Sequence, residues 1–113
     1  MYGRKKIKVF EHVLGDSGND VLHGRLEFNE GRKLRRFSLN LTTMSESSMK
    51  TEIARFDCAH GHLHMHRFYR KPATTEKIDL EISVETVEKL ISQIKQNRNA
   101  WKKALMENYG GIE

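Results

Sequence analysis

The sequence predicts an α+β fold, with a twisted antiparallel sheet of about five to six strands and one long C-terminal helix packed on one face. Residues 5–82 form short stretches in which apolar and polar side chains alternate, and turn-forming residues separate these stretches. Residues 84–108 instead repeat apolar side chains at helical spacing. No repeat or linker interrupts the 113 residues, so we expect a single domain over residues 1–113.

The N-terminal part predicts two strands and a hairpin turn. Ile7 and Val9 alternate with lysines, a pattern typical of an edge strand whose charges discourage pairing with other chains. Residues 15–20 are rich in turn formers and predict a loop, and residues 21–28 predict the next strand. The hairpin turn is expected at residues 29–32.

Burial of one face predicts the register of this hairpin, because a slip of one residue would scatter its apolar side chains. The best match sets Phe28 opposite Lys33 and Leu22 opposite Leu39. One face then carries Leu22, Leu26, Phe28, Phe37, Leu39 and Leu41, and the other carries His23, Arg25, Glu27, Arg36, Ser38 and Asn40.

A second hairpin is expected further along the chain. Residues 50–57 predict a strand, and residues 58–61 predict a turn that contains His60, because Gly61 can adopt a positive backbone angle. Matching the faces again pairs Asp57 with His62, Arg55 with His64, and Ile53 with His66.

The C-terminal part predicts one more strand and the helix. Pro72 interrupts the strand pattern, which resumes over residues 77–83. Ser83 is a candidate helix N-cap because its hydroxyl can accept a hydrogen bond from the first turn, and Gly110 and Gly111 mark the helix end. The apolar stripe expected to cover the sheet comprises Val84, Val87, Leu90, Ile91, Ile94, Trp101 and Leu105.

Composition limits the class of protein and of partner. Twenty Lys and Arg against fifteen Asp and Glu give a net charge of +5, which favours an acidic partner such as RNA or an acidic protein. Cys58 is the only cysteine, so an internal disulfide is excluded and a reducing, cytoplasmic setting is expected. No apolar run reaches the roughly 18 residues of a membrane span, so we expect no membrane partner and no export signal.

Four of the six histidines stand at every second position from 60 to 66. Side chains alternate faces along a strand, so His62, His64 and His66 should project from one side while Leu63 and Met65 point toward the core. We expect the imidazoles to lie on the sheet face that the helix leaves uncovered. Imidazole titrates near neutral pH and binds transition metals, so this row is the main functional signal in the sequence.

Two kinds of chemistry suit such a row. In the first, His62, His64 and His66 bind Zn or another transition metal, with a third ligand drawn from His23 or Asp57 where only two histidines reach the ion.

In the second, which requires no cofactor, the face cleaves RNA. That reaction needs a base to remove the proton of the 2′-hydroxyl and an acid to protonate the leaving oxygen. It also needs a cation to stabilise the charged phosphorane. We expect His62 and His64 to be acid and base, and Asp57 to orient one imidazole. The substrate-binding candidates are Arg55, which would hold phosphate, together with Arg36 and His66.

A purely structural role is the alternative to both. Histidine is tolerated on solvated strands, and Asp57 paired with a neighbouring histidine contributes only a few tenths of a kcal/mol. Cys58 is expected to be a small buried side chain rather than a nucleophile.

Residues 53–69 also carry a family resemblance. An arginine, aromatic and acidic run precedes a turn with histidine and a histidine-rich strand, in the order Arg55-Phe56-Asp57-Cys58-Ala59-His60-Gly61-His62-Leu63-His64-Met65-His66-Arg67-Phe68. This segment resembles the small TumE-like proteins of prokaryotic toxin-antitoxin modules. The resemblance implies a toxin-like endoribonuclease role opposed by an antitoxin, with Arg55, Asp57, His62, His64 and His66 as the matching positions.

Overall fold

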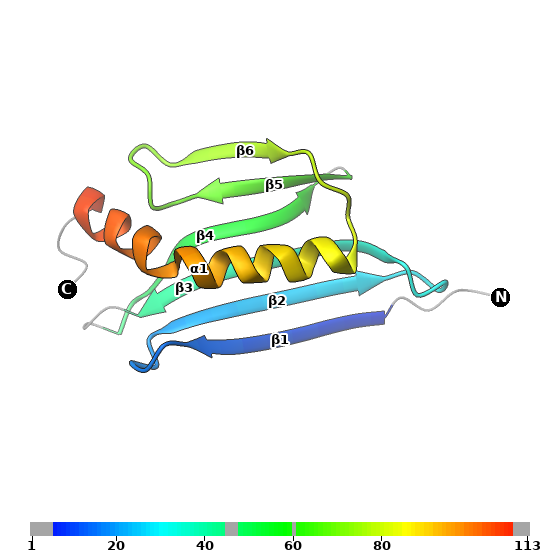
Figure 1. The fold of residues 1–113 in the computed structure, drawn as a ribbon, viewed down its shortest axis with the longest axis horizontal. Helices are drawn as coiled ribbons and strands as arrows, with labels where there is room; N and C mark the ends of the chain where they lie inside the picture. Colours follow the sequence, from blue (N-terminus) through cyan, green and yellow to red (C-terminus); the bar gives the residue numbers. More distant parts are fainter. Residues whose placement is uncertain (1–5, 45–47, 60, 110–113) are drawn as a thin grey trace.

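The computed structural model describes residues 6–44, 48–59 and 61–109. Its elements are β1 (Lys6–Leu14), β2 (Asp20–Phe28), β3 (Leu34–Met44), β4 (Lys50–Ala59), β5 (His62–Arg67), β6 (Thr74–Ile78) and α1 (Val84–Tyr109). The strands form one antiparallel sheet in chain order, and α1 lies across one face of that sheet (Figure 1). The predicted α+β fold, with a six-stranded sheet and one C-terminal helix, is therefore confirmed.

The core lies between the sheet and α1. The sheet contributes Leu22, Phe37, Leu39, Leu41, Phe56, Leu63 and Met65, and the helix contributes Val87, Leu90, Ile94 and Leu105. Burial against the opposite layer thus explains both the period of two along the strands and the helical spacing along α1. One member of the predicted stripe differs: Val84 is 42% exposed, because it is the first residue of α1 and Thr86 and Val87 face the core instead.

The predicted register of the first hairpin is wrong by two residues, although its predicted faces are right. Leu22 pairs with Leu41 rather than with Leu39. Phe28 pairs with Leu34, one residue from the prediction, and a bulge between Glu27 and Phe28 adds the second residue of the shift by leaving Arg35 without a partner in β2.

The predicted register of the second hairpin is also wrong by two. Asp57 pairs with His64 and Arg55 with His66, because pairing continues to Ala59 and His62 and leaves a two-residue connection. Gly61 has a φ of 79°, the left-handed conformation that tight hairpin turns require. His60, the other residue predicted in this turn, lies outside the described residues.

The last strand begins earlier than predicted. β6 covers Thr74–Ile78 rather than residues 77–83, and its pairing with β5 ends at Ile78 opposite Leu63, the second residue of β5. The N-cap prediction is confirmed, since the Thr86 amide donates to Ser83 Oγ over 3.1 Å. Gly110 and Gly111 lie outside the described residues. In the described part of the chain, no helix has the length and apolar character needed to cross a membrane.

A buried carboxylate joins α1 to the β1–β2 end of the sheet. Asp20 is fully buried and accepts hydrogen bonds from Arg98 and Lys102 of α1 and, over 2.7 Å, from Thr43 of β3. Burial by itself raises the pKa of Asp20, but the hydrogen bonds from Thr43, Lys102 and Arg98 outweigh it and hold the pKa below its usual value. This cluster fastens the helix to one face of the sheet and leaves the other face free.

Candidate functional site

The sheet face opposite α1, which we call the open face, carries two rows of side chains that are polar except for Val9. Each row runs across all six strands, because the residues that pair between neighbouring strands lie side by side. The first row is Val9, Arg25, Ser38, Asp57, His64 and Lys77, and the second is Glu11, His23, Asn40, Arg55, His66 and Thr75.

The imidazole of His66 has a partner at each ring nitrogen. Its Nε2 lies 3.3 Å from Asp57 Oδ2 and 3.4 Å from Oδ1, and its Nδ1 lies 3.2 Å from Thr75 Oγ1. The ring also stacks on Phe68 with 5.8 Å between centroids. In the neutral tautomer that suits these partners, Nε2–H donates to the carboxylate and Nδ1 accepts from the hydroxyl. The carboxylate of Asp57 and the hydroxyl of Thr75 thus contact opposite nitrogens of the same imidazole.

His64 lies beside this arrangement. Its backbone pairs with Asp57, and its Nδ1 lies 3.2 Å from the carbonyl oxygen of His62, to which it donates. That contact leaves Nε2 of His64 available to a ligand. His62 is exposed at the start of β5.

The expectation for Asp57 changes accordingly. Asp57 was expected to orient the imidazole of His62 opposite it, but its carboxylate contacts His66 instead. The two-residue change of register causes this difference, because it moves His62 away from Asp57 and brings His66 into diagonal reach.

Arg55 is held by carboxylates of the protein itself. Its Nε donates to Asp57 Oδ2 over 3.1 Å and its Nη1 to Glu52 Oε1 over 3.2 Å, while the guanidinium lies 5.4 Å from the centre of the Phe68 ring. Glu52 Oε1 also accepts from Asn40 Nδ2 over 2.8 Å. Arg55 therefore orients Asp57, and two of its donors are not free for a phosphate.

Arg36 lies on the open face as predicted, with its side chain 63% exposed. Its Nε is 3.8 Å from Glu27 Oε2, which Arg25 shares. The long distance and the exposure make this a weak ion pair, so Arg36 can turn toward a ligand.

Two residues of this site were missed by sequence reasoning. Lys77 pairs with His64, and Thr75 pairs with His66. Within the described residues, no carboxylate lies within 4 Å of the Lys77 ammonium. The signal that could have found them is the alternation of Thr75 and Lys77 read as a strand that follows Pro72 directly, in place of the later strand that we predicted.

The metal alternative finds little support in the arrangement of side chains. Among the described residues there is no group of three or more His, Cys, Asp and Glu side chains that could hold a metal ion. His23, a suggested third ligand, has its ring nitrogens 3.0 Å from Glu11 Oε1 and from Thr42 Oγ1. Its strand β2 is separated from β5 by β3 and β4.

Cys58 follows Asp57 in β4 but is half-buried on the core face, where it pairs with Leu63. Burial is the main cause that raises the pKa of its thiol. A hydrogen bond with the Phe37 backbone opposes it in part, the Asp57 carboxylate raises the pKa further by a smaller amount, and Arg36 opposes it least. A thiol with a raised pKa is a poor nucleophile at neutral pH.

A family model covers most of this architecture. The family described as "Domain of unknown function (DUF7718)" matches residues 14–109, which include strands β2 to β6 with their part of the open face, and α1. This chain belongs to that family. No curated protein and no solved structure matches the chain. The family description assigns no activity, so the likeness to TumE-like proteins stays a prediction.

Proposed function

We propose that the open face binds RNA and cleaves its backbone without a metal, with His66 as general base and His64 as general acid. The observation that carries the proposal is the His66 ring, whose two nitrogens face a carboxylate and a hydroxyl. Asp57 fixes the ring and favours the imidazolium that forms when Nδ1 takes up a proton. His64 lies on the same face, and no residue in the described part of the chain hydrogen-bonds to its Nε2.

The reaction uses these groups in one order. The substrate 2′-hydroxyl takes the place of Thr75 as the donor to Nδ1 of His66, which accepts its proton. The 2′ oxygen then attacks the adjacent phosphorus, and the bond from phosphorus to the 5′ oxygen breaks. Protonated His64 gives its Nε2 proton to that leaving oxygen. The products are a 2′,3′-cyclic phosphate and a free 5′-hydroxyl.

Lys77 supplies the cation that the phosphorane requires. It is next to His64 in the first row and has no carboxylate partner among the described residues. Arg55 acts through Asp57 and is a positioning residue. These roles of Lys77 and Arg55 differ from the expectation that Arg55 holds phosphate, because Arg55 already donates to two carboxylates.

The test is cleavage of a labelled 12-nucleotide RNA in the presence of EDTA. Acid and base groups of this kind contribute about 10²- to 10⁴-fold each, so His66→Ala and His64→Ala should lower the rate by at least about a hundredfold. His12→Ala is the control, because it removes an exposed imidazole of β1 that lies outside the two rows of the open face, and it should leave the rate unchanged. Folded His66→Ala and His64→Ala proteins with wild-type rates would remove the proposal. Loss of activity in EDTA with recovery in zinc would favour the metal alternative instead.

The biological role that we propose follows from the resemblance to TumE-like proteins. Cleavage of cellular RNA in the cytoplasm would arrest growth unless an antitoxin, or another acidic protein, covered the open face. Induced expression should therefore slow bacterial growth, and the His64→Ala and His66→Ala variants should not. Equal growth of cells that express the wild-type protein would contradict this role.

A further inference from the structure

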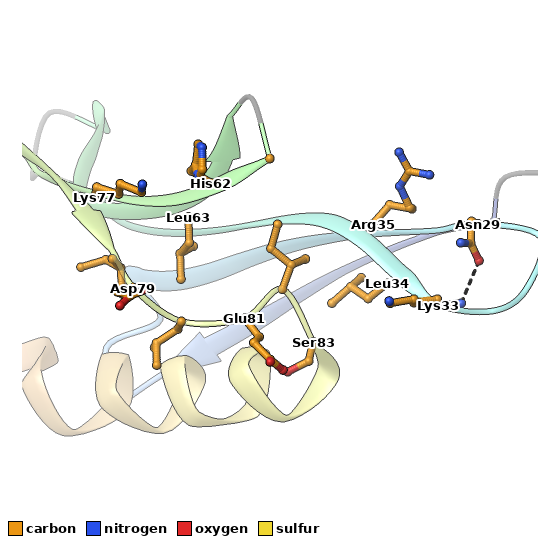
Figure 2. A pocket seen from close by; sticks show the side chains of 14 residues that line it. Asn29, Lys33, Leu34, Arg35, His62, Leu63, Lys77, Asp79, Glu81 and Ser83 are labelled. Carbon is orange, nitrogen blue, oxygen red and sulfur yellow. Dashed lines mark hydrogen bonds between the residues drawn. The ribbon is translucent and has the colours of Figure 1, made fainter.

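A cleft beside the proposed catalytic pair has features of a nucleotide site. It has a volume of about 760 Å³ and lies between the sheet and the β6–α1 connection, which ends at Ser83. That volume falls within the range of about 300–1,000 Å³ typical of ligand sites. The start of β5, the end of β6 and the β6–α1 connection line it together with the β2–β3 turn (Figure 2). Because Lys77 lines the cleft and pairs with His64, the cleft opens next to the histidine row.

Four basic side chains, which we call the basic rim, line this cleft: Lys33, Arg35, His62 and Lys77. Figure 2 shows Arg35 and His62 pointing away from the helix. In the described part of the chain, none of the three Lys and Arg side chains has a carboxylate within 4 Å. Cations without internal partners that line a cleft suit the phosphates of a polyanion.

The side nearest the helix has the opposite charge. Asp79 and Glu81 line the cleft from the β6–α1 connection and are exposed, and Figure 2 shows Glu81 next to Ser83 at the first turn of α1. Among the described residues, no cationic nitrogen lies within 4 Å of either carboxylate. A carboxylate accepts hydrogen bonds from exocyclic amines of nucleobases, whereas it repels phosphates.

Between the two sides lies an apolar wall. Leu34 and Leu63 are buried and point toward the helix, and Ile78, Leu80 and Ile82 are half-buried. A base splayed out of a single strand can lie against such a wall while its edge reaches a polar group. The order of basic rim, apolar wall and acidic side therefore matches the order of phosphate, base face and base edge in one nucleotide.

We propose that this cleft binds one nucleotide of a single-stranded RNA, with its phosphate on the basic rim and an amine-bearing base directed to Asp79 and Glu81. The inference rests on the proposed function, since it places the strand beside His64. It adds a preference for cytosine over uracil, because cytosine carries an exocyclic amine where uracil carries a carbonyl.

The test measures binding and not cleavage. Two 2′-O-methyl oligonucleotides, C12 and U12, have equal charge and cannot be cut, so their Kd values are independent of any reaction. We expect C12 to bind about tenfold more tightly than U12, within the discrimination that one good base contact gives. The double variant Asp79→Asn/Glu81→Gln should bring the ratio of the two Kd values close to one. Equal Kd values for wild-type protein would overturn the base preference.

A second double variant tests the basic rim. Lys33→Ala/Arg35→Ala removes two phosphate contacts, which should weaken C12 binding at least about tenfold and lower the slope of log Kd against log salt by about 1.4. Lys89→Ala/Lys95→Ala removes the same charge from exposed positions of α1 and should change neither quantity. Unchanged binding by the first variant, or equal loss by both, would overturn the site. His64→Ala and His66→Ala should still bind C12. A result against the catalytic proposal can therefore be told apart from a result against this binding site.

Discussion

Replacement of Asp20 by asparagine tests how the helix is fastened to one face of the sheet. The change keeps the size of the side chain and removes its charge. Asp20 is fully buried, and it accepts hydrogen bonds from Thr43, Lys102 and Arg98. In the variant, the cations of α1 face a neutral amide whose nitrogen can only donate.

The size of the effect follows from these contacts. A hydrogen bond to a charged group contributes about 1.5–3 kcal/mol, and Asp20 has two from cations. The loss is smaller than their sum for two reasons. Arg98 and Lys102 are 20% and 22% exposed and regain water, and the variant no longer buries a charge. We expect the free energy of unfolding to fall by about 2–4 kcal/mol, within or slightly below the usual cost of breaking a buried ion pair.

Thermal unfolding followed by circular dichroism measures this loss. For a domain of this size, about 4 °C of Tm per kcal/mol gives a decrease of about 8–16 °C. Asp16→Asn, at an exposed position in the neighbouring loop, is the control and should unfold like the wild-type protein. A decrease below about 4 °C for Asp20→Asn would refute the reasoning, because the gain from the ion pairs would then only offset the cost of burial.

The same contacts predict the pH dependence. The pKa of Asp20 is lowered in the folded protein, so the unfolded chain binds a proton first as pH falls. The stabilisation is complete above the unfolded pKa of about 3.9 and is lost as pH falls toward the folded pKa. The difference in stability between wild type and Asp20→Asn should be constant from pH 7 to 5 and should shrink below about pH 4.

Three further predictions concern packing and reactivity. Gly24→Ala should destabilise by about 1–3 kcal/mol in urea unfolding, because the new Cβ would lie 2.1 Å from the Phe10 ring; unchanged stability would mean that the ring moves aside freely. Trp101→Ala should cost about 2–3 kcal/mol, since half-buried Trp101 stacks on Tyr69 at 5.5 Å, and a loss below 1 kcal/mol would contradict that packing. Cys58 should react with a thiol reagent at least about tenfold more slowly in native protein than in urea, and equal rates would show that burial does not protect it.

The faces of the sheet were predictable from sequence, whereas the partners within a face were not. Leu63 and Met65 point to the core and His64 and His66 to the open face, because a period of two admits only that choice. A shift of two residues preserves this pattern. The contact between Asp57 and His66 therefore depends on the length of the turn, which hydrophobic pattern does not report.

Bulges and strand ends limited the prediction in the same way. The pairing of Leu41 with Ala54 and of Thr42 with Glu52 leaves Ile53 as an extra residue, and its buried side chain gave no sign of this irregularity. Lys77 was assigned to a strand that begins at its own position, so its pairing with His64 was not foreseen. Local pattern specifies burial, but pairing of distant segments specifies the site.

The most direct test of the central claim uses a DNA oligonucleotide with a single ribonucleotide. If His66 activates a 2′-hydroxyl and His64 protonates the leaving oxygen, the purified protein should cut this strand only on the 3′ side of the ribose in EDTA. The fragment should carry a 2′,3′-cyclic phosphate. An intact strand after incubation with a large excess of folded protein, or equal cutting of an all-DNA strand, would contradict the account.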